Sequence, residues 1–306
     1  GTMGSLQTVI LCQDECTEPD VTHNGDEETD VNGMFEFMLH NGNNIPIAYS
    51  STPNFCYNPS YGYNTIYYVS AICGLPSGGH PALSGCYSIS AGTPVMWQQN
   101  PIAAAGTDKD TCGLVLSLHG NTPVAGMYGY WSSDCEFFAV GGTAHTDPDA
   151  IVMATEFNTC TFTWNVVNGG CVASDEVVLG FLDTPRPFAG DDMTVCGNTA
   201  TMEGVPSLAG TDLIWSGNGT SFNPQSSANA QALVSIYGTY QYTLTESNSA
   251  CSGEDQVLVT YIKPPSPIVP NSSDTVCGTS YDLHVITTAD ADGQWRAYDP
   301  DMILLN

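Results

Sequence analysis

The stretch AGDDMTVCG at residues 189–197 opens a segment that continues through Trp215 to YGTYQYTLTESNSAC at 237–251 and SGEDQVLVTYI at 252–262. Polar and apolar residues alternate along the last two pieces, and β-branched and aromatic side chains are frequent, as in half-buried strands. The turn cluster Ser216-Gly-Asn-Gly separates two of these pieces. The segment predicts one small β-sandwich with a cysteine near its start, a central tryptophan and a second cysteine before its last strand.

The same order of residues recurs along the chain. Cys112, Trp131 and Cys171 mark an upstream copy, and Cys277 and Trp295 mark the beginning of a downstream copy. The spacing from the first cysteine to the tryptophan is 19 residues in the two earlier copies and 18 in the last. Successive first cysteines are 84 and 81 residues apart. Fixed markers at such a period predict tandem copies of one domain.

The expected fold class is all-β, with tandem immunoglobulin-like β-sandwich domains joined by short Pro-rich linkers. We expect residues 1–8 to be a tag or an arbitrary start, and 9–97 to form a β-sandwich module with a cysteine-stapled loop. Residues 105–182 and 189–262 are the expected immunoglobulin-like repeats, and 268–306 an incomplete one. Proline cannot donate to a strand ladder, so the Pro-rich stretches before residues 189 and 271 are expected to be linkers.

The charge balance excludes several classes of partner. The chain has 4 Lys and Arg against 32 Asp and Glu, a net charge of −28. Nucleic-acid binding requires a basic surface, and docking on anionic lipid does too. The sequence contains no run of 18 apolar residues, which is the length that would predict a membrane-spanning segment. An acidic, solvated surface suits salty surroundings.

Twelve cysteines without a CxxC pair predict disulfides in an oxidising, extracellular compartment rather than zinc sites. Cys56 is expected to pair with Cys12 or Cys16, an alternative that the sequence leaves open. The expected partner of Cys277 falls some 55–59 residues on, past Asn306, so Cys277 belongs either to a shortened domain or to an inter-subunit disulfide. The other expected pairs are Cys112–Cys171, Cys196–Cys251, Cys135–Cys160 and Cys73–Cys86.

Aromatic residues are expected to build the cores. Trp131, Trp215 and Trp295 should be buried between the sheets, as in immunoglobulin-like domains. Tyr237-Gly-Thr-Tyr240 is typical of the turn that carries a tyrosine corner. The position of Tyr240 corresponds to Cys160 in the upstream copy, where a disulfide would replace the aromatic anchor.

Two sets of side chains are candidate binding sites. Asp108, Asp191, Asp192 and Asp274 recur at the starts of the repeats, where their carboxylates suit either Ca²⁺ or the capping of backbone amides. Tyr57, Tyr61 and Tyr63 lie in a tyrosine-rich loop that suits either sugar stacking or a core. No nucleophile, phosphate-loop or metalloprotease motif occurs, so we expect no catalytic residues and no enzyme activity.

The motifs AGTDKDTCG at 105–113, AGDDMTVCG at 189–197, NGGCVASDEVVL at 168–179 and NSACSGEDQVLV at 248–259 resemble the PKD-like, immunoglobulin-like repeats of giant Bacteroidota surface proteins. The piece FEFMLHNGNNIPIAY at 35–49 resembles a companion module of these proteins. The resemblance implies export by type IX secretion and a cell-surface location. It also implies a role as an adhesin, a SprB-like gliding filament or an appendage for contact with prey.

The implied partners are neighbouring repeats of the same long protein, identical subunits in a filament, or a surface polysaccharide. The alternative function is a glycan- or protein-binding module that uses the tyrosine-rich loop. Asp274-Thr275-Val276 is similar to the short O-glycosylation motif of the phylum, which makes Thr275 a candidate glycosylation site.

Overall fold

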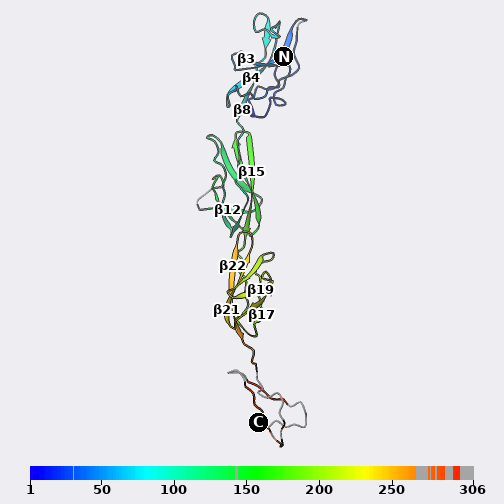
Figure 1. Cartoon of the computed structure of the whole chain (residues 1–306). Coiled ribbons are helices and arrows are strands. Elements are labelled where there is room, and N and C mark those ends of the chain that lie inside the picture. The colour runs from blue at the N-terminus through cyan, green and yellow to red at the C-terminus, as the bar shows by residue number, and fades with distance from the viewer. Residues whose placement is uncertain are drawn as a thin grey trace. The chain divides into compact units, whose positions relative to one another are not determined.

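The computed structural model describes residues 1–29, 31–141, 144–266, 275, 277–279, 281–286 and 292–296. All named elements in this part of the chain are strands (Figure 1). The chain divides into two compact units, Gly1–Leu182 and Asp183–Asn306, and each is described by itself. No helix in the described ranges has the length and apolar character needed to cross a membrane. The predicted domain at 268–306 lies largely outside the described residues.

The first domain contains one large sheet. Its strand order is β1-β8-β4-β2-β3, and β7 also pairs with β4, while β5 and β6 form a separate two-stranded ribbon. The strands are β1 (Val9–Cys12), β2 (Met34–His40), β3 (Pro46–Ser50), β4 (Ile66–Gly74), β5 (Pro76–Ser77), β6 (His80–Pro81), β7 (Tyr87–Ile89) and β8 (Thr93–Gln98).

Irregular segments, rather than a second sheet, cover the core of this domain. Alternate residues of β1, β2, β4 and β8 point to one face, where Trp97 is fully buried. Met3, Val21 and Phe55, which lie outside the named strands, close that core. Residues 9–97 therefore differ from the two-sheet sandwich that the sequence predicts, although one face of their sheet is buried in an apolar core.

The second domain is a two-sheet sandwich. One sheet has the order β11-β14-β15-β9 and the other β10-β13-β12, and Trp131 of β11 lies directly opposite Trp164 of β14. Both indoles are buried in the core between the sheets. The strands are β9 (Lys109–Cys112), β10 (Val115–Ser117), β11 (Tyr128–Ser133), β12 (Phe137–Val140), β13 (Ile151–Ala154), β14 (Thr159–Asn168) and β15 (Cys171–Leu182).

The third domain repeats this architecture. Its sheets have the orders β16-β22-β21-β18 and β17-β20-β19, and Trp215 is fully buried between them. The strands are β16 (Met193–Cys196), β17 (Thr199–Thr201), β18 (Asp212–Ser216), β19 (Thr220–Asn223), β20 (Gln231–Val234), β21 (Gly238–Ser247) and β22 (Ser252–Ile262). The prediction of an all-β chain with tandem immunoglobulin-like sandwiches is confirmed. Trp295, in contrast to the expectation, is 40% exposed.

The first and last strands of each domain pair in parallel. Cys12 lies opposite Gln98, and Cys196 lies opposite Ile262, so each first strand ends level with the end of the last strand. The β9–β15 pair of the second domain has the same parallel arrangement. The incoming and outgoing strands of each domain therefore run side by side in one direction, and opposed forces on them load the ladder hydrogen bonds together in shear.

The anchor predicted for the third domain is present. Tyr240 donates its hydroxyl to the carbonyl of Ile236 at 2.7 Å, which is the geometry of a tyrosine corner. Tyr242 donates to the hydroxyl of Tyr261 at 3.1 Å inside the core. The pKa of Tyr261 is raised mainly by burial of its hydroxyl and, to a smaller extent, by the hydrogen bond with Tyr242.

A buried carboxylate fixes the loop that follows the second-to-third domain linker. Glu246 of β21 is fully buried and accepts hydrogen bonds from the backbone amides of Ser207 and Leu208, each at 2.9 Å, and from the Thr211 hydroxyl at 2.6 Å. Ser207 accepts the backbone amide of Arg186 in the linker at 2.6 Å. Desolvation acts to raise the pKa of Glu246, but these hydrogen bonds outweigh it and the pKa is lowered.

Candidate functional site at the domain junction

A disulfide joins the first two domains. Cys12, the last residue of β1, bonds Cys171, the first residue of β15, with their Cα atoms 5.6 Å apart. The two cysteines are separated by 159 positions in the sequence, so the bond closes a very long loop. Cys12 lies opposite Gln98, the last residue of β8, so the bond connects this end of the first domain to the start of the last strand of the second domain.

Hydrogen bonds seat the hairpin against the end of β8. Asn168 donates its side-chain amide to the carbonyl of Gln99 at 2.7 Å, and Gly170 donates its backbone amide to the Gln98 side-chain oxygen at 3.2 Å. Gly169 adopts φ +58°, and a Cβ there would collide with the Gln98 amide group. The hairpin covers Gln98, which is only 9% exposed. The junction is thus a specific contact with a covalent bond at its centre.

The predicted Cys112–Cys171 and Cys196–Cys251 disulfides must be corrected. Cys171 bonds Cys12, and Cys196 is free. Cys112 lies opposite Leu182, the far end of β15, whereas Cys171 begins that strand. At about 3.3 Å per residue the length of β15 places them roughly 35 Å apart. The parallel pairing of β16 with β22 separates Cys196 and Cys251 in the same way. Cys112 and Cys251 are disulfide-bonded, but not to these expected partners.

Two disulfides lie within single domains. The predicted Cys135–Cys160 bond is present, with the Cα atoms 5.7 Å apart, and Cys160 occupies the strand position that Tyr240 has in the third domain. Cys16 bonds Cys56, which is one of the two pairings that the sequence leaves open.

Cys73 and Cys86 are free, contrary to the predicted pair, and so is Cys277. The β4–β7 register sets Cys73 opposite Ser88, so Cys86 lies diagonally across the ladder. Diagonal neighbours are about 7–8 Å apart, which exceeds the Cα distance of an ordinary disulfide.

The recurring aspartates hold the last strand of each sandwich. Asp108 accepts the backbone amide of Val178 at 2.9 Å, and Asp192 accepts that of Leu258 at 2.8 Å. These equivalent contacts favour the capping alternative over Ca²⁺ coordination. Asp191 is exposed, and Asp274 lies outside the described residues.

The described residues bring together one set of three side chains with the spacing of a metal site, namely Asp134, Cys135 and Cys160. The two sulfur atoms are bonded to each other, so they are not available as thiolate ligands. The histidines of the described part do not add to this set. This set therefore does not offer the thiolates of a zinc site.

The tyrosine-rich loop packs on the first domain. Tyr57 and Tyr63 stack with ring centroids 4.7 Å apart, and Tyr61 lies 5.6 Å from the Trp97 ring. All three tyrosines are half-buried. The hydrogen bond with Tyr63 raises the pKa of Tyr57 to about 12. Tyr57 and Tyr61 therefore pack against the core of the first domain, and Tyr63 stacks on Tyr57.

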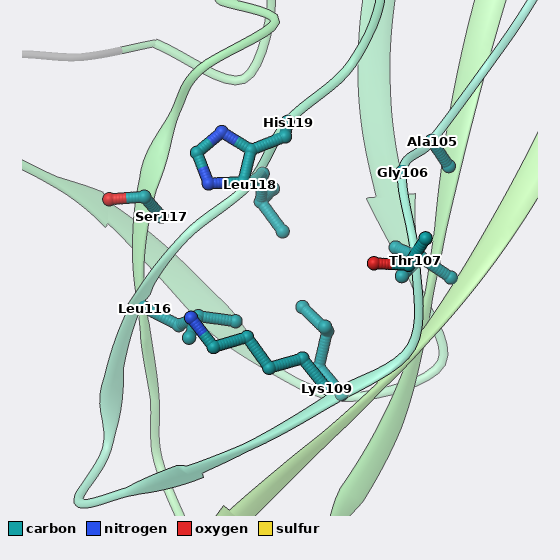
Figure 2. A pocket seen from close by; sticks show the side chains of 10 residues that line it. Ala105, Gly106, Thr107, Lys109, Leu116, Ser117, Leu118 and His119 are labelled. Carbon is teal, nitrogen blue, oxygen red and sulfur yellow. The ribbon is translucent and has the colours of Figure 1, made fainter.

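In the described part of the chain, the hollows considered as ligand sites lie on the two sandwiches. One, of about 190 Å³, lies in the second domain, where Figure 2 shows Thr107 and Lys109 on one segment facing Leu116 and His119 on another. It is smaller than the roughly 300–1,000 Å³ of typical ligand pockets. The other is an open depression in the third domain, lined mainly by small polar residues such as Asn198 and Ser221. Thr275, the candidate glycosylation residue, is exposed.

Comparisons with solved structures return strings of immunoglobulin domains. Extracellular domains 3–5 of Drosophila OTK share 11% identity at a TM-score of 0.39, covering 84% of this chain and 94% of that one. A mutated three-domain stretch of titin shares 10% identity at 0.39, covering 84% and 96%. Immunoglobulin domains 1–5 of Sidekick-1 share 9% identity at 0.37, covering 88% and 62%. No protein-family description matches the sequence, and no curated protein matches it.

Proposed function

We propose that this chain is a structural segment of a long extracellular filament or cell-surface adhesin, built from disulfide-stapled immunoglobulin-like repeats. The observation that carries the proposal is the Cys12–Cys171 bond, which joins one domain covalently to the next. A flexible linker alone would let neighbouring domains reorient, as they do by default in multidomain chains. The bond and the seated hairpin fix the junction instead.

The junction disulfide provides a covalent path for tension. Force on β15 passes through Cys171 to Cys12 and into β1, and it bypasses the residues between them. Those residues cannot add length to the chain even when their domains unfold. A protein that maintains its reach under load gains directly from this connection.

The surface chemistry agrees with an exported, non-enzymatic component. The net charge of −28 favours a solvated surface in salty surroundings, and the disulfides need an oxidising compartment. The repeat motifs support export by type IX secretion and a role in attachment, gliding or contact with prey. The partners are neighbouring repeats or identical subunits. The packed tyrosine-rich loop gives no specific support to glycan binding.

Pulling the chain by its two ends tests the proposal. Under oxidising conditions, Cys12→Ser should add tens of nanometres to the fully extended length, since each released residue contributes about 3.3–3.6 Å. Cys135→Ser is the matched control, because Cys135 and Cys160 lie inside the loop that the junction bond already closes. Equal extension of the wild type and Cys12→Ser chains would refute a load-bearing junction.

A further inference from the structure

We propose that the hollow in the second domain binds a small aliphatic carboxylate. The hollow lies between β9 and β10, and each of these strands is the terminal strand of its own sheet. It is therefore placed at the open side of the sandwich, where the two sheets part. This binding role goes beyond the proposed structural role and does not depend on it.

The floor of the hollow is apolar. Leu116 and Leu118 contribute to it from β10 and the segment that follows, and Val177 and Leu179 contribute from β15. All four side chains belong to the core of the domain. The volume of about 190 Å³ excludes a drug-sized ligand but admits a short aliphatic chain. Such a chain would leave water by packing on these side chains.

The rim of the hollow is polar and carries a cation. Figure 2 shows the Lys109 side chain extended toward the segment of Leu116, and the Thr107 hydroxyl facing the hollow. Asp149 lies 3.3 Å from a ring nitrogen of His119, on the same rim. Among the described residues no carboxylate forms an ion pair with Lys109. The ammonium group of Lys109 is therefore available to an anion.

The acidic residue next to Lys109 is directed away from the hollow. Asp108 accepts the backbone amide of Val178 at 2.9 Å. The hollow is lined instead by the neighbours of that residue, Val177 and Leu179. Because side chains alternate along a strand, these neighbours face the opposite side of β15. The Asp108 carboxylate is thus held by the strand ladder and does not occupy the place of an anionic ligand.

The third domain has an apolar side chain where the second has Lys109. The two repeat-start motifs align without gaps, which places Met193 at the position of Lys109. Each lies opposite the equivalent residue of the last strand, Leu179 and Val259 respectively. Met193 is half-buried and packs against the core of its domain, whereas Lys109 is exposed. The second domain thus has a hollow and a charge where the third has an apolar contact.

The rim of the third domain is also more acidic. The same alignment places Asp191 at the position of Thr107. The equivalent of His119 is Glu203, since the carbonyl of each lies beside the glycine of its repeat start. The second domain therefore has a hydroxyl and an imidazole where the third has two carboxylates. In a chain with 4 Lys and Arg against 32 Asp and Glu, this exchange favours an anionic ligand.

The two parts of the ligand follow from the floor and the rim. Its carboxylate faces the ammonium of Lys109, with the Thr107 hydroxyl as a further donor, and its branched chain lies on the leucine and valine side chains. Lys109 is exposed, so the ion pair itself is weak. For a ligand of this size we expect a dissociation constant on the order of 1 mM.

Methyl NMR of the whole chain tests the site, with sodium isovalerate as the probe. Saturable shifts should appear at the methyl groups of Leu116, Val177 and Leu179. The methyl groups of Val257 and Val259 occupy the equivalent positions in the third domain and should not shift. Equal shifts in both domains would mean that isovalerate binds without specificity and would overturn the proposal.

Two variants and a matched control examine the charge. Lys109→Gln should weaken isovalerate binding about five- to tenfold, since it removes the ammonium and retains most of the side chain. Lys109→Met should abolish binding, because the new side chain can pack on the core as Met193 does. Lys263→Gln removes the same charge from an exposed position outside the second domain and should bind like the wild type. Unchanged circular dichroism shows that the variants remain folded.

The neutral amide isovaleramide has the same shape as the probe and should bind about tenfold more weakly, because it lacks the negative charge. No saturable shift at concentrations well above the expected dissociation constant would overturn the proposal. Equal binding of the acid and the amide, or undiminished binding by Lys109→Met, would do so too.

The same chemistry has two sources, a free branched-chain acid and the C-terminal carboxylate of a peptide that ends in leucine. An acetylated peptide of this kind is compared with its C-terminal amide. Tighter binding of the peptide acid than of isovalerate would assign the site to a protein C-terminus. Binding of isovalerate without binding of the peptide acid would assign it to the free acid, and binding of neither would refute the site.

Discussion

Replacing Glu246 should lower the free energy of unfolding of the third domain more than replacing an exposed carboxylate does. The carboxylate is buried and accepts the backbone amides of Ser207 and Leu208, and the Glu246→Ala variant leaves both without this acceptor. Both hydrogen bonds are part-buried, so water can reach the amides, and the loss of two bonds worth about 0.5–1.5 kcal/mol each predicts a destabilisation of about 1–3 kcal/mol. Glu246→Gln retains one acceptor oxygen and should lose about half as much.

Hydrogen–deuterium exchange followed by mass spectrometry measures this loss within one domain. Peptides from 199–262 should lose about tenfold in protection for every 1.4 kcal/mol, while peptides from the second domain should not change. Glu254→Gln is the matched control, because Glu254 is exposed and the substitution removes the same charge. If Glu246→Ala lies within about 0.5 kcal/mol of this control, the buried hydrogen bonds do not stabilise the domain as described.

The same residue predicts a pH dependence. Its pKa in the folded domain is lowered from the ordinary 4.5, so its contribution to stability is fully present above that value. The contribution is lost as the pH falls below 4.5 through the folded pKa, because the carboxyl group then binds a proton more readily in the unfolded chain. Glu246→Gln should remove this part of the acid sensitivity of the third domain.

Three further changes probe other contacts. Tyr240→Phe removes the tyrosine-corner hydrogen bond and should cost the third domain about 0.5–1.5 kcal/mol by the same exchange measurement. Tyr63→Phe should bring the pKa of Tyr57 down from about 12, measured by NMR titration. Asp192→Ala should expose the β22 amides to exchange, whereas EDTA should not change the melting temperature of the wild type, because the carboxylate caps a backbone amide.

Each of these has a clear contrary result. Unchanged protection from hydrogen exchange in Tyr240→Phe would show that the Tyr240 hydroxyl does not stabilise the third domain. A Tyr57 titration that ignores Tyr63 would assign the shift to another cause. A fall in melting temperature with EDTA would restore Ca²⁺ as a ligand at the repeat starts.

The sequence was informative where the pattern is local. Alternation identified the strands, and the fixed spacing of Trp131 and Trp215 from their preceding cysteines located two buried cores. Alignment of the two repeats also placed Cys160 of the second domain at the position of Tyr240 in the third. The structure has the predicted disulfide between Cys160 and Cys135.

The disulfide pattern was not predictable from spacing. Separations of 59 and 55 residues resemble the bond within an immunoglobulin domain, but that bond requires the two cysteines to lie level with each other. Alternation does not show whether a first strand pairs in parallel or antiparallel with the last one. The parallel pairing of β9 with β15 places Cys112 at the opposite end from Cys171 and directs Cys171 to Cys12 of the preceding domain.

The long separation of Cys12 from Cys171 also imposes an order on biosynthesis. Cys12 precedes its partner by 159 residues in the chain, whereas Cys16, four residues after Cys12, has its partner within the same domain. Domains form as units, N-terminal first, so the Cys16–Cys56 bond can close while Cys12 still waits as a thiol. The junction bond can close only when β15 of the second domain is present, so the first domain folds and closes its own disulfide before its junction is made.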